Sequence, residues 1–190
     1  MRFVLATRND HKLREFDALL APDGVDPLPA SVVLPPETGS GFAENALGKA
    51  RAAALGTGRV AIADDSGIEA AALGGAPGVR SARYAGEHAT DQQNLDLLLR
   101  EAPDGSALAY VCALAWVDPE SGQEHVVHGR CSGRLTSEPR GDGGFGYDPA
   151  FVPDDEPGDR TMAQLTAAEK DAISHRGRAV RELVRWLATR

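Results

Sequence analysis

Apolar residues along the chain alternate between short continuous runs and longer amphipathic stretches, which predicts a protein built from strands and helices in turn. The run from Phe3 to Ala6 predicts a buried strand, and Leu13, Phe16 and Leu19 then fall on one face of a helix. Prolines between 21 and 36 exclude a helix there and leave room for a short strand at 31–34. A helix is predicted over 41–55, capped by Ser40 and ending at Gly56, and a strand follows over 60–63. Further along, a Thr90/Gln93 capping box predicts a helix, and strands over 107–117 and 124–135 form a predicted hairpin. A second capping box, Thr166/Glu169, begins a helical stripe that continues to the C-terminus.

The stretch from Val60 to Gly86 carries the strongest signal for a functional site. Its apolar run leads into Asp64 and Asp65, followed by Ser66 and glycine, which predicts a strand that ends in a tight, acidic turn. Ligands of open α/β sheets bind beyond the carboxyl ends of such strands. Because side chains alternate along a strand, the two aspartates leave it in different directions, one to hold a cation and the other to approach a water. A surface turn with no chemical role remains an alternative.

Composition narrows the classes of partner. The 190 residues suit one domain, 1–190, with or without two lobes, and the formal net charge of −8 argues against general affinity for nucleic acid or an anionic membrane. A polyanionic substrate must therefore be held by local cations or by a metal ion. The longest apolar runs are too short for a membrane span or a signal sequence, so we expect a soluble, cytoplasmic protein. Cys112 and Cys131 are expected to be reduced packing residues.

Two polar segments are candidates for phosphate binding. The turn at 7–12 lies between a strand and a helix, where backbone N–H groups and the positive helix end can seat a phosphate, and Lys12 can add a charge. The spacing of a Walker loop is absent, and an ordinary connection is the alternative. Lys49 lies four residues after Asn45 on one helix face, and a solvated surface charge is the alternative for this lysine.

The segment 140–151 is the most glycine-dense part of the chain. Glycines there let the backbone approach a flat ligand, and Phe145 or Tyr147 can stack on a base. Lys170, His175 and Arg176 project from the helical region that follows, although a single histidine on a helix usually has a surface or packing role. His125 and His128 fall on opposite faces of a strand, which is poor geometry for a shared metal.

Six segments in order together resemble the inosine triphosphate pyrophosphatase family, and they span nearly the whole chain. They are TRNDHK (7–12), FAENALGKA (42–50), ADDSG (63–67), LGGAPGVRSARYAG (73–86), GGFGYDPAF (143–151) and SHRGRA (174–179). The resemblance implies an α/β fold with a long, bent mixed β-sheet, flanking helices and two lobes around a central cleft, assembled as a homodimer. It also implies Mg²⁺-dependent hydrolysis of non-standard purine nucleoside triphosphates, ITP, dITP and XTP, to the monophosphate and pyrophosphate.

The same resemblance assigns roles to matching positions. It implies that Asp65 is the general base and a metal ligand, that Glu37 is the other metal ligand and that Asp64 supports this acidic centre. Arg8 departs from the glycine that the family often has after the first threonine, so this side chain either reaches a phosphate or points to solvent. The substrate-binding residues implied are Thr7, Arg8, Asn9, Asp10, His11, Lys12 and Lys49 for the triphosphate, and Ser66, Phe145, Gly146, Tyr147, Asp148, Lys170, His175 and Arg176 for the nucleoside.

The chemistry of the residues agrees with that assignment. A triphosphate carries about four negative charges, so an acidic protein holds it through Mg²⁺ on carboxylates together with lysine and arginine side chains. Hypoxanthine and xanthine present an acceptor oxygen where adenine presents an amine, so fixed donors such as His175 or Arg176 can discriminate between them. Two other classes remain alternatives, a metal-dependent phosphatase that forms an aspartyl phosphate at ADDSG, and a nucleotide sensor without turnover.

Overall fold

The computed structural model describes residues 2–190, and the chain folds into two compact units. Unit 1 comprises Met1–Asp65, Cys112–Gly129 and Arg176–Arg190, and unit 2 comprises Ser66–Val111 and Arg130–His175. No described helix combines the length and the apolar composition that a membrane crossing requires. Both cysteines are buried, one in each unit, and they do not form a disulfide.

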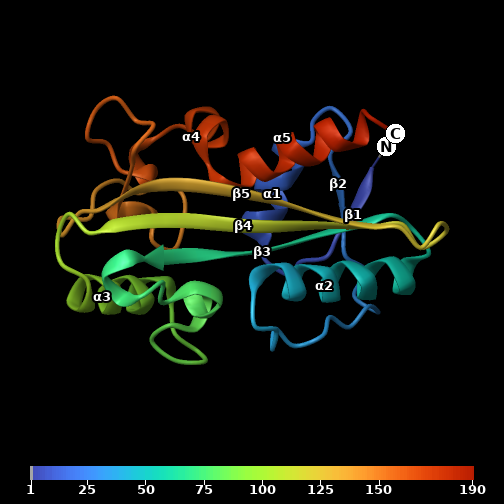
Figure 1. The fold of residues 1–190 in the computed structure, drawn as a ribbon, viewed down its shortest axis with the longest axis horizontal. Coiled ribbons are helices and arrows are strands. Elements are labelled where there is room, and N and C mark those ends of the chain that lie inside the picture. The colour runs from blue at the N-terminus through green and yellow to red at the C-terminus, as the bar shows by residue number, and fades with distance from the viewer. Residues whose placement is uncertain (1) are drawn as a thin grey trace. The chain divides into compact units, whose positions relative to one another are not determined.

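One mixed sheet supplies the framework, with six strands in the order β2-β1-β3-β4-β5-β6. Strand β1 pairs in parallel with β2 and β3, whereas β5 and β6 pair antiparallel. Figure 1 shows this sheet with helices packed along its strands, so the α/β class predicted from the sequence is confirmed. The strands are β1 (Phe3–Leu5), β2 (Val25–Pro27), β3 (Ala61–Ala70), β4 (Ala107–Val117), β5 (Glu124–Leu135) and β6 (Phe151–Pro153).

Unit 1 covers its part of the sheet on both faces. Helix α2 (Phe42–Thr57) packs on one face and helices α1 (Asp10–Leu19) and α5 (His175–Leu187) pack on the other (Figure 1). Alternation along β3 places Ala61 and Ala63 in the core under α2, and Ile62 in the core under α1 and α5. A strand buried on both faces reads as a continuous apolar run, which is why the sequence identified β1, β3 and β4.

The predicted acidic turn after Ala63 is wrong, because β3 continues through both aspartates to Ala70. The prediction failed because an Asp-Asp-Ser-Gly sequence is typical of turns. In the structure, side chains from both sides of the sheet bind the two carboxylates, so the strand continues through them without exposing them to solvent. Their alternation is retained, since Asp64 contacts α1 and α5 while Asp65 contacts α2.

Two other predictions in the first third of the chain need correction. No strand forms at 31–34; the strand is β2, at Val25–Pro27, where it pairs with β1. The N-cap of helix α2 is Gly41 rather than Ser40, and the helix ends at Thr57, followed by the C-cap Gly58, whose φ of +64° suits glycine. Gly56 lies inside the helix, and a larger residue is disfavoured there because a Cβ would come within 2.8 Å of Val32 Cγ2.

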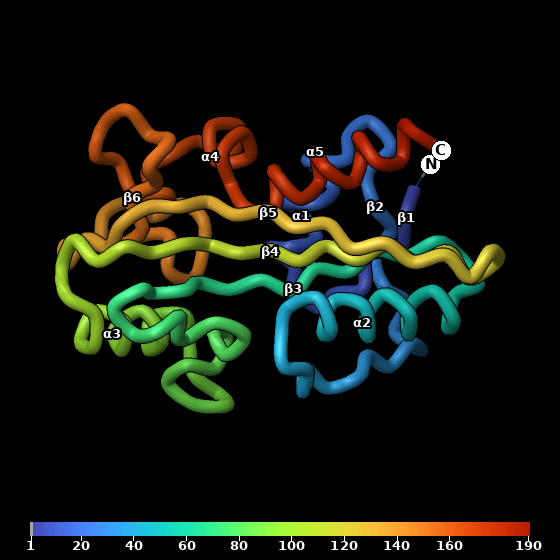
Figure 2. The backbone as a smooth tube through the Cα atoms, in the orientation of Figure 1, coloured from blue at the N-terminus to red at the C-terminus, as the bar shows by residue number. Residues whose placement is uncertain are grey.

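Unit 2 has its own core, which helix α3 (Asp91–Glu101) shares with strands β4 and β5. Both predicted capping boxes are present, at the start of α3 and at the start of α4 (Ala167–Ile173). The predicted C-terminal stripe is two helices, because Ser174 is extended and separates α4 from α5. Figure 2 follows the predicted hairpin, in which β4 and β5 run side by side from their connecting turn. The 3-10 helices are η1 (Ala71–Leu73), η2 (Gly78–Arg83), η3 (Asp148–Ala150) and η4 (Met162–Gln164).

Candidate active site

Asp64 is the most deeply buried charge of unit 1, with 1% of its surface exposed. Its Oδ2 lies 2.9 Å from Lys12 Nζ on α1 and 3.4 Å from Arg176 Nε on α5. Burial alone would raise the pKa of Asp64, but the nearby cations Lys12, Arg176 and Lys49 outweigh it and hold that pKa below its ordinary value. Asp64 is therefore a fixed negative charge that orients two cations.

Arg176 is held from a second side by Glu15, whose Oε2 lies 2.9 Å from the Arg176 Nη1. The arginine side chain is 6% exposed, so its position is set by these two carboxylates. Glu15 was missed at the sequence level. The available signal was its spacing, since it lies three residues after Lys12 and hence on the same face of α1.

Asp65 points to the opposite face of β3 and meets a neutral partner. Asn45 Nδ2, on α2, donates to Asp65 Oδ2 over 2.8 Å, and Asn45 Oδ1 accepts the backbone N–H of Gly39 over 2.8 Å. Burial raises the pKa of Asp65, and the charge of Glu37 adds to that rise, while Lys49 and the Asn45 hydrogen bond oppose it. Of the two aspartates, Asp65 is thus the one suited to accept a proton.

Glu37 and Lys49 form an ion pair between the loop before α2 and α2 itself. Lys49 is buried, so the alternative of a solvated surface charge is wrong. Its burial lowers the pKa of the ammonium, but the carboxylates of Asp64 and Glu37 outweigh this effect and raise that pKa. Lys49 therefore carries a full positive charge among carboxylates.

The carboxylates of Glu37 and Asp65 are a donor set that suits a hard divalent cation. The two carboxylates interact electrostatically, and the charge of Glu37 contributes to the raised pKa of Asp65. Among residues 2–190, no group of three or more histidine, cysteine, aspartate or glutamate side chains is arranged to hold a metal ion. Mg²⁺ typically takes only one or two protein carboxylates and completes its shell with phosphate oxygens and waters, so the two carboxylates fit this ion.

The turn at 7–12 is organised by its own side chains. Asn9 caps α1 by accepting the backbone N–H groups of His11 and Lys12, at 2.9 and 3.1 Å, and Thr7 Oγ1 accepts the N–H of Asn9. Those helix N–H groups are thus occupied by Asn9. The basic group that this turn brings to the acidic centre is Lys12, and the side chain of Asp10 is exposed.

Arg8 is exposed, and its hydrogen bonds are to backbone rather than to the acidic cluster. Its guanidinium donates to the backbone carbonyls of Leu28, Pro29 and Val32 at 2.8, 2.9 and 2.8 Å. Of the two alternatives for this residue, exposure to solvent agrees with the structure, and the phosphate contact stays a prediction. Arg8 ties the polar turn to the loop that leads to Glu37.

Unit 2 contains a second group of candidate residues, centred on Asp148. Its Oδ2 accepts Lys170 Nζ at 2.8 Å and the backbone N–H of Phe145 at 3.0 Å, and its Oδ1 accepts the Tyr110 hydroxyl at 2.9 Å. Lys170 Nζ also lies 5.0 Å from the centre of the Phe145 ring. One buried carboxylate thus orders the glycine-dense loop and fixes the lysine.

The other predicted residues of unit 2 have different surroundings. The His175 ring stacks on Tyr110, a residue that the sequence did not single out. Tyr147 belongs to the core, where its hydroxyl donates to the Ser81 carbonyl over 2.7 Å, so Phe145 is the aromatic ring of this loop that remains half-buried. Ser66, next to Asp65 on β3, is also half-buried.

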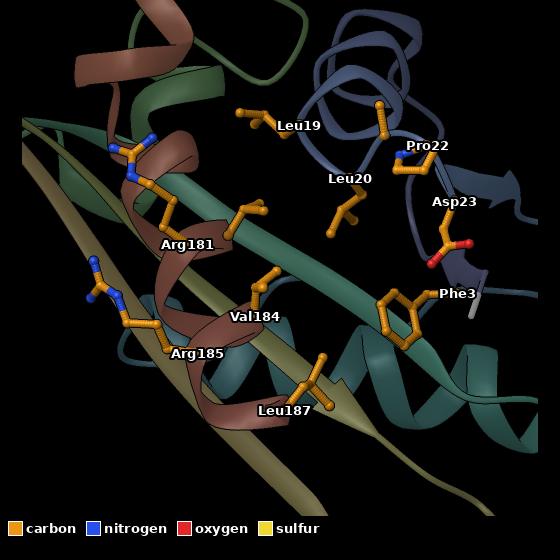
Figure 3. A pocket seen from close by; sticks show the side chains of 11 residues that line it. Phe3, Leu19, Leu20, Pro22, Asp23, Arg181, Val184, Arg185 and Leu187 are labelled. Carbon is orange, nitrogen blue, oxygen red and sulfur yellow. The ribbon is translucent and has the colours of Figure 1, made fainter. Parts of the chain in front are cut away.

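A separate hollow of unit 1, of about 630 Å³, lies between the end of α1 and α5 (Figure 3). Its walls are mostly apolar, with Leu19, Leu20 and Val184 among them, and Figure 3 shows the guanidinium groups of Arg181 and Arg185 pointing away from those side chains. It shares no residue with the acidic cluster. The hollow is therefore distinct from the candidate active site.

These features define an α/β protein with a mixed sheet and, on its third strand, two adjacent buried aspartates balanced by lysine and arginine. Residues 3–186 match the model of the Ham1 family, and the chain belongs to that family. This membership confirms the resemblance seen in the sequence.

Similar proteins of known name cover almost the full chain. A dITP/XTP pyrophosphatase of Mycolicibacterium paratuberculosis is 52% identical and aligns over 98% of this chain and 95% of the relative. A dITP/XTP pyrophosphatase of Streptomyces coelicolor is 50% identical and aligns over 96% of this chain and 95% of the relative. A HAM1 protein structure from Coxiella burnetii has a TM-score of 0.86 at 41% identity and covers 100% of both chains. A dITP/XTP pyrophosphatase structure from Mycobacterium abscessus has a TM-score of 0.74 at 45% identity and covers 96% of this chain and 98% of that one.

Proposed function

We propose that this protein hydrolyses non-standard purine nucleoside triphosphates, ITP, dITP and XTP, to the nucleoside monophosphate and pyrophosphate, and so clears them from the nucleotide pool. The observation that carries the proposal is the contrast on β3, where Asp64 contacts the cations Lys12 and Arg176 while its neighbour Asp65 accepts a hydrogen bond from Asn45 on the opposite face. Burial also raises the pKa of Asp65. Relatives about half identical that are named dITP/XTP pyrophosphatases support the substrate class.

In this proposal the residues of unit 1 bind the triphosphate and cleave it. Asp65 takes a proton from a water, whose oxygen attacks the α-phosphorus as the bond to the pyrophosphate oxygen breaks. Lys12 and Lys49 offset the negative charge of the phosphate oxygens, and Asp64 keeps Lys12 in place. Asn45 fixes the direction of the Asp65 carboxylate. No covalent intermediate on the protein is required.

We further propose that Glu37 and Asp65 hold the Mg²⁺ on which the reaction depends. When bound, this ion would neutralise phosphate oxygens and stabilise charge on the departing pyrophosphate. Glu37 would exchange part of its contact with Lys49 for the cation, which releases Lys49 toward the phosphates.

The residues around Asp148 in unit 2 would bind the nucleoside. Phe145 offers a ring face for the base, and Lys170 and His175 offer donors for an acceptor oxygen at the purine 6-position. Arg176, held by Asp64 and Glu15, would add a further cation. Adenine, with an amine at that position, would leave these donors unpaired.

The direct experiment incubates the protein with ITP, dITP, XTP, ATP and GTP in the presence of Mg²⁺, identifies the products, and repeats the reaction in EDTA and in ¹⁸O-water. We expect pyrophosphate release from ITP, dITP and XTP, loss of activity in EDTA, and ¹⁸O in the nucleoside monophosphate. Release of orthophosphate, or a trapped phosphoenzyme, would point instead to a phosphatase. Tight binding without turnover would point to a nucleotide sensor.

Assembly and location are proposals of the same kind. The family resemblance implies a homodimer, and sedimentation that shows only monomer at micromolar concentration would exclude it. The net charge of −8 predicts no general affinity for nucleic acid, and a cytoplasmic location agrees with a nucleotide substrate.

A further inference from the structure

We propose that Tyr110 is the positioning residue that sets base selectivity, because it fixes Asp148 through its hydroxyl and His175 through its ring. The inference rests on the proposed function and adds a residue to the nucleoside group of unit 2. Tyr110 lies on β4 and is 7% exposed, so it acts on the substrate through those two neighbours rather than by contact.

The hydroxyl of Tyr110 completes the hydrogen bonding of a buried carboxylate. It donates to Asp148 Oδ1 at 2.9 Å, while Lys170 and the Phe145 N–H bind the other oxygen, at 2.8 and 3.0 Å. A carboxylate held at both oxygens cannot rotate, so the Lys170 ammonium and the loop backbone are fixed with it. The loop backbone packs closely against this carboxylate, since a Cβ on Gly144 would lie 2.1 Å from Asp148 Oδ2.

The ring of Tyr110 controls the orientation of the imidazole. The Tyr110 and His175 rings are nearly parallel, at 8°, with centroids 4.7 Å apart. Phe151 meets the Tyr110 ring edge to face, with a centroid distance of 4.8 Å. Since Tyr110 cannot tilt without disturbing this packing, the plane of His175 is fixed, and so are the directions of its ring nitrogens.

Fixed donors are what discriminate a 6-oxo purine from adenine. Recognition geometry is productive only within about 0.5 Å, so a looser Asp148 or His175 would weaken binding of the correct base and reduce the penalty on the wrong one. The residues proposed to cleave the triphosphate belong to unit 1, so a change at Tyr110 in unit 2 should leave the chemical step unaffected. Tyr110 should therefore affect KM and selectivity more than kcat.

The first test compares Tyr110→Phe, which keeps the ring and removes the hydroxyl, with the matched control Tyr84→Phe. Tyr84 belongs to the same unit and packs on the same core, and its hydroxyl also donates to a carboxylate, that of Glu101, which is not among the nucleoside residues. We expect Tyr110→Phe to raise the KM for ITP about tenfold, to keep kcat within about twofold, and to lower the ratio of kcat/KM for ITP over ATP about tenfold. The control should change none of these values. An unchanged KM and ratio, or a loss confined to kcat, would overturn the proposal.

The second test reads the contact itself, by NMR of the His175 ring protons, assigned through loss of their signals in His175→Gln. A stacked aromatic ring shifts these protons upfield, so we expect the same shifts in wild type and Tyr110→Phe, and loss of the shift in Tyr110→Leu. Unmoved signals in Tyr110→Leu would overturn the positioning role. Should the wild type hydrolyse no purine nucleotide, the proposed function fails and the selectivity role with it, whereas the NMR result still decides whether Tyr110 orients His175.

Discussion

Helices α2 and α3 share a buried asparagine in their first turn, and the difference in what it binds shows how this protein builds its acidic centre. Each has a buried asparagine at its fourth position, Asn45 in α2 and Asn94 in α3, whose Oδ1 accepts a backbone N–H of the preceding loop over 2.8 Å. The Nδ2 of Asn94 donates to the carbonyl of Ala82, whereas the Nδ2 of Asn45 donates to the carboxylate of Asp65. One structural device thus closes a loop in unit 2 and orients the proposed base in unit 1.

The same contrast extends to the carboxylates. Asp64 is surrounded by cations, Asp65 by an amide and burial, and Asp148 by a phenol, a lysine and a backbone amide. Which donors face a buried carboxylate decides whether it stays ionised, takes a proton or acts as a scaffold. The following variants test that distinction.

The largest effect is expected from Asp64→Asn, which leaves the buried Arg176 and the half-buried Lys12 without their shared negative charge. Removing one partner of a buried ion pair costs about 3 kcal/mol or more of the free energy of unfolding. Urea denaturation would show the loss as a lower midpoint. The control Glu182→Gln breaks an exposed pair with Arg185 in the same unit and should cost less than about 0.5 kcal/mol. Equal midpoints for the two variants would refute the role given to Asp64.

Asp65→Asn should lower kcat for ITP at least about 10²-fold, or about 2.7 kcal/mol of transition-state stabilisation, because an amide cannot accept the proton. Nucleotide binding, measured by calorimetry with a non-hydrolysable triphosphate, should largely persist. Near-normal turnover would move the role of base to Asp64.

Asn45→Leu should lower kcat/KM about tenfold, near 1.4 kcal/mol, and raise the Mg²⁺ concentration needed for half-maximal activity, since the Asp65 carboxylate loses its orienting donor. The matched variant Asn94→Leu removes the equivalent bonds in α3 and should reduce stability alone. If both variants needed the same Mg²⁺ concentration for half-maximal activity, a positioning role for Asn45 would be excluded.

Arg8→Ala should cost about 1 kcal/mol of stability, because it frees the carbonyls of the 28–32 loop, and should change the KM for ITP by less than about twofold. Arg14→Ala, on the exposed face of α1, serves as the control. A rise of tenfold or more in KM would show that Arg8 contacts the substrate after all.

The smallest effect is expected from Glu169→Gln in unit 2, which keeps the α4 capping box and removes an exposed charge. Arg160, followed by the backbone N–H and the hydroxyl of Thr166, lowers the pKa of Glu169 from 4.5 to about 2. A depressed pKa stabilises the fold above about pH 4.5, and this stabilisation disappears as the pH falls through about 2. The wild type should therefore have the higher Tm at neutral pH, and the difference should close in acid. A difference that persists at about pH 2 would exclude this ion pair as its source.

The sequence predicted those parts of the fold that local patterns determine. The Thr90/Gln93 capping box and the apolar run of β4 specify their elements through neighbouring residues alone. The continuation of β3 through Asp64 could not be predicted, because it depends on cations brought from α1 and α5, at positions 12 and 176. From local composition alone, the sequence Asp-Asp-Ser-Gly predicts an exposed turn, as it is typical of turns in proteins.

The candidate residues show the same limit. The motif at 42–50 placed Asn45 beside Lys49, but nothing in it indicates a bond to Asp65 twenty positions later. Tyr110 was hidden in a run of eleven residues, 107–117, that reads simply as a buried strand. Its importance comes from partners at 148 and 175, which only the folded chain brings together.

The alternation along β3 also restricts how this gene can change. Because Asp64 and Asp65 serve opposite faces of one strand, a single-residue insertion or deletion just before them would exchange their surroundings, giving the cations to the wrong carboxylate and the asparagine to the other. Side chains at 60–63 can drift among small apolar types, whereas the number of residues between the end of α2 and these aspartates must be preserved.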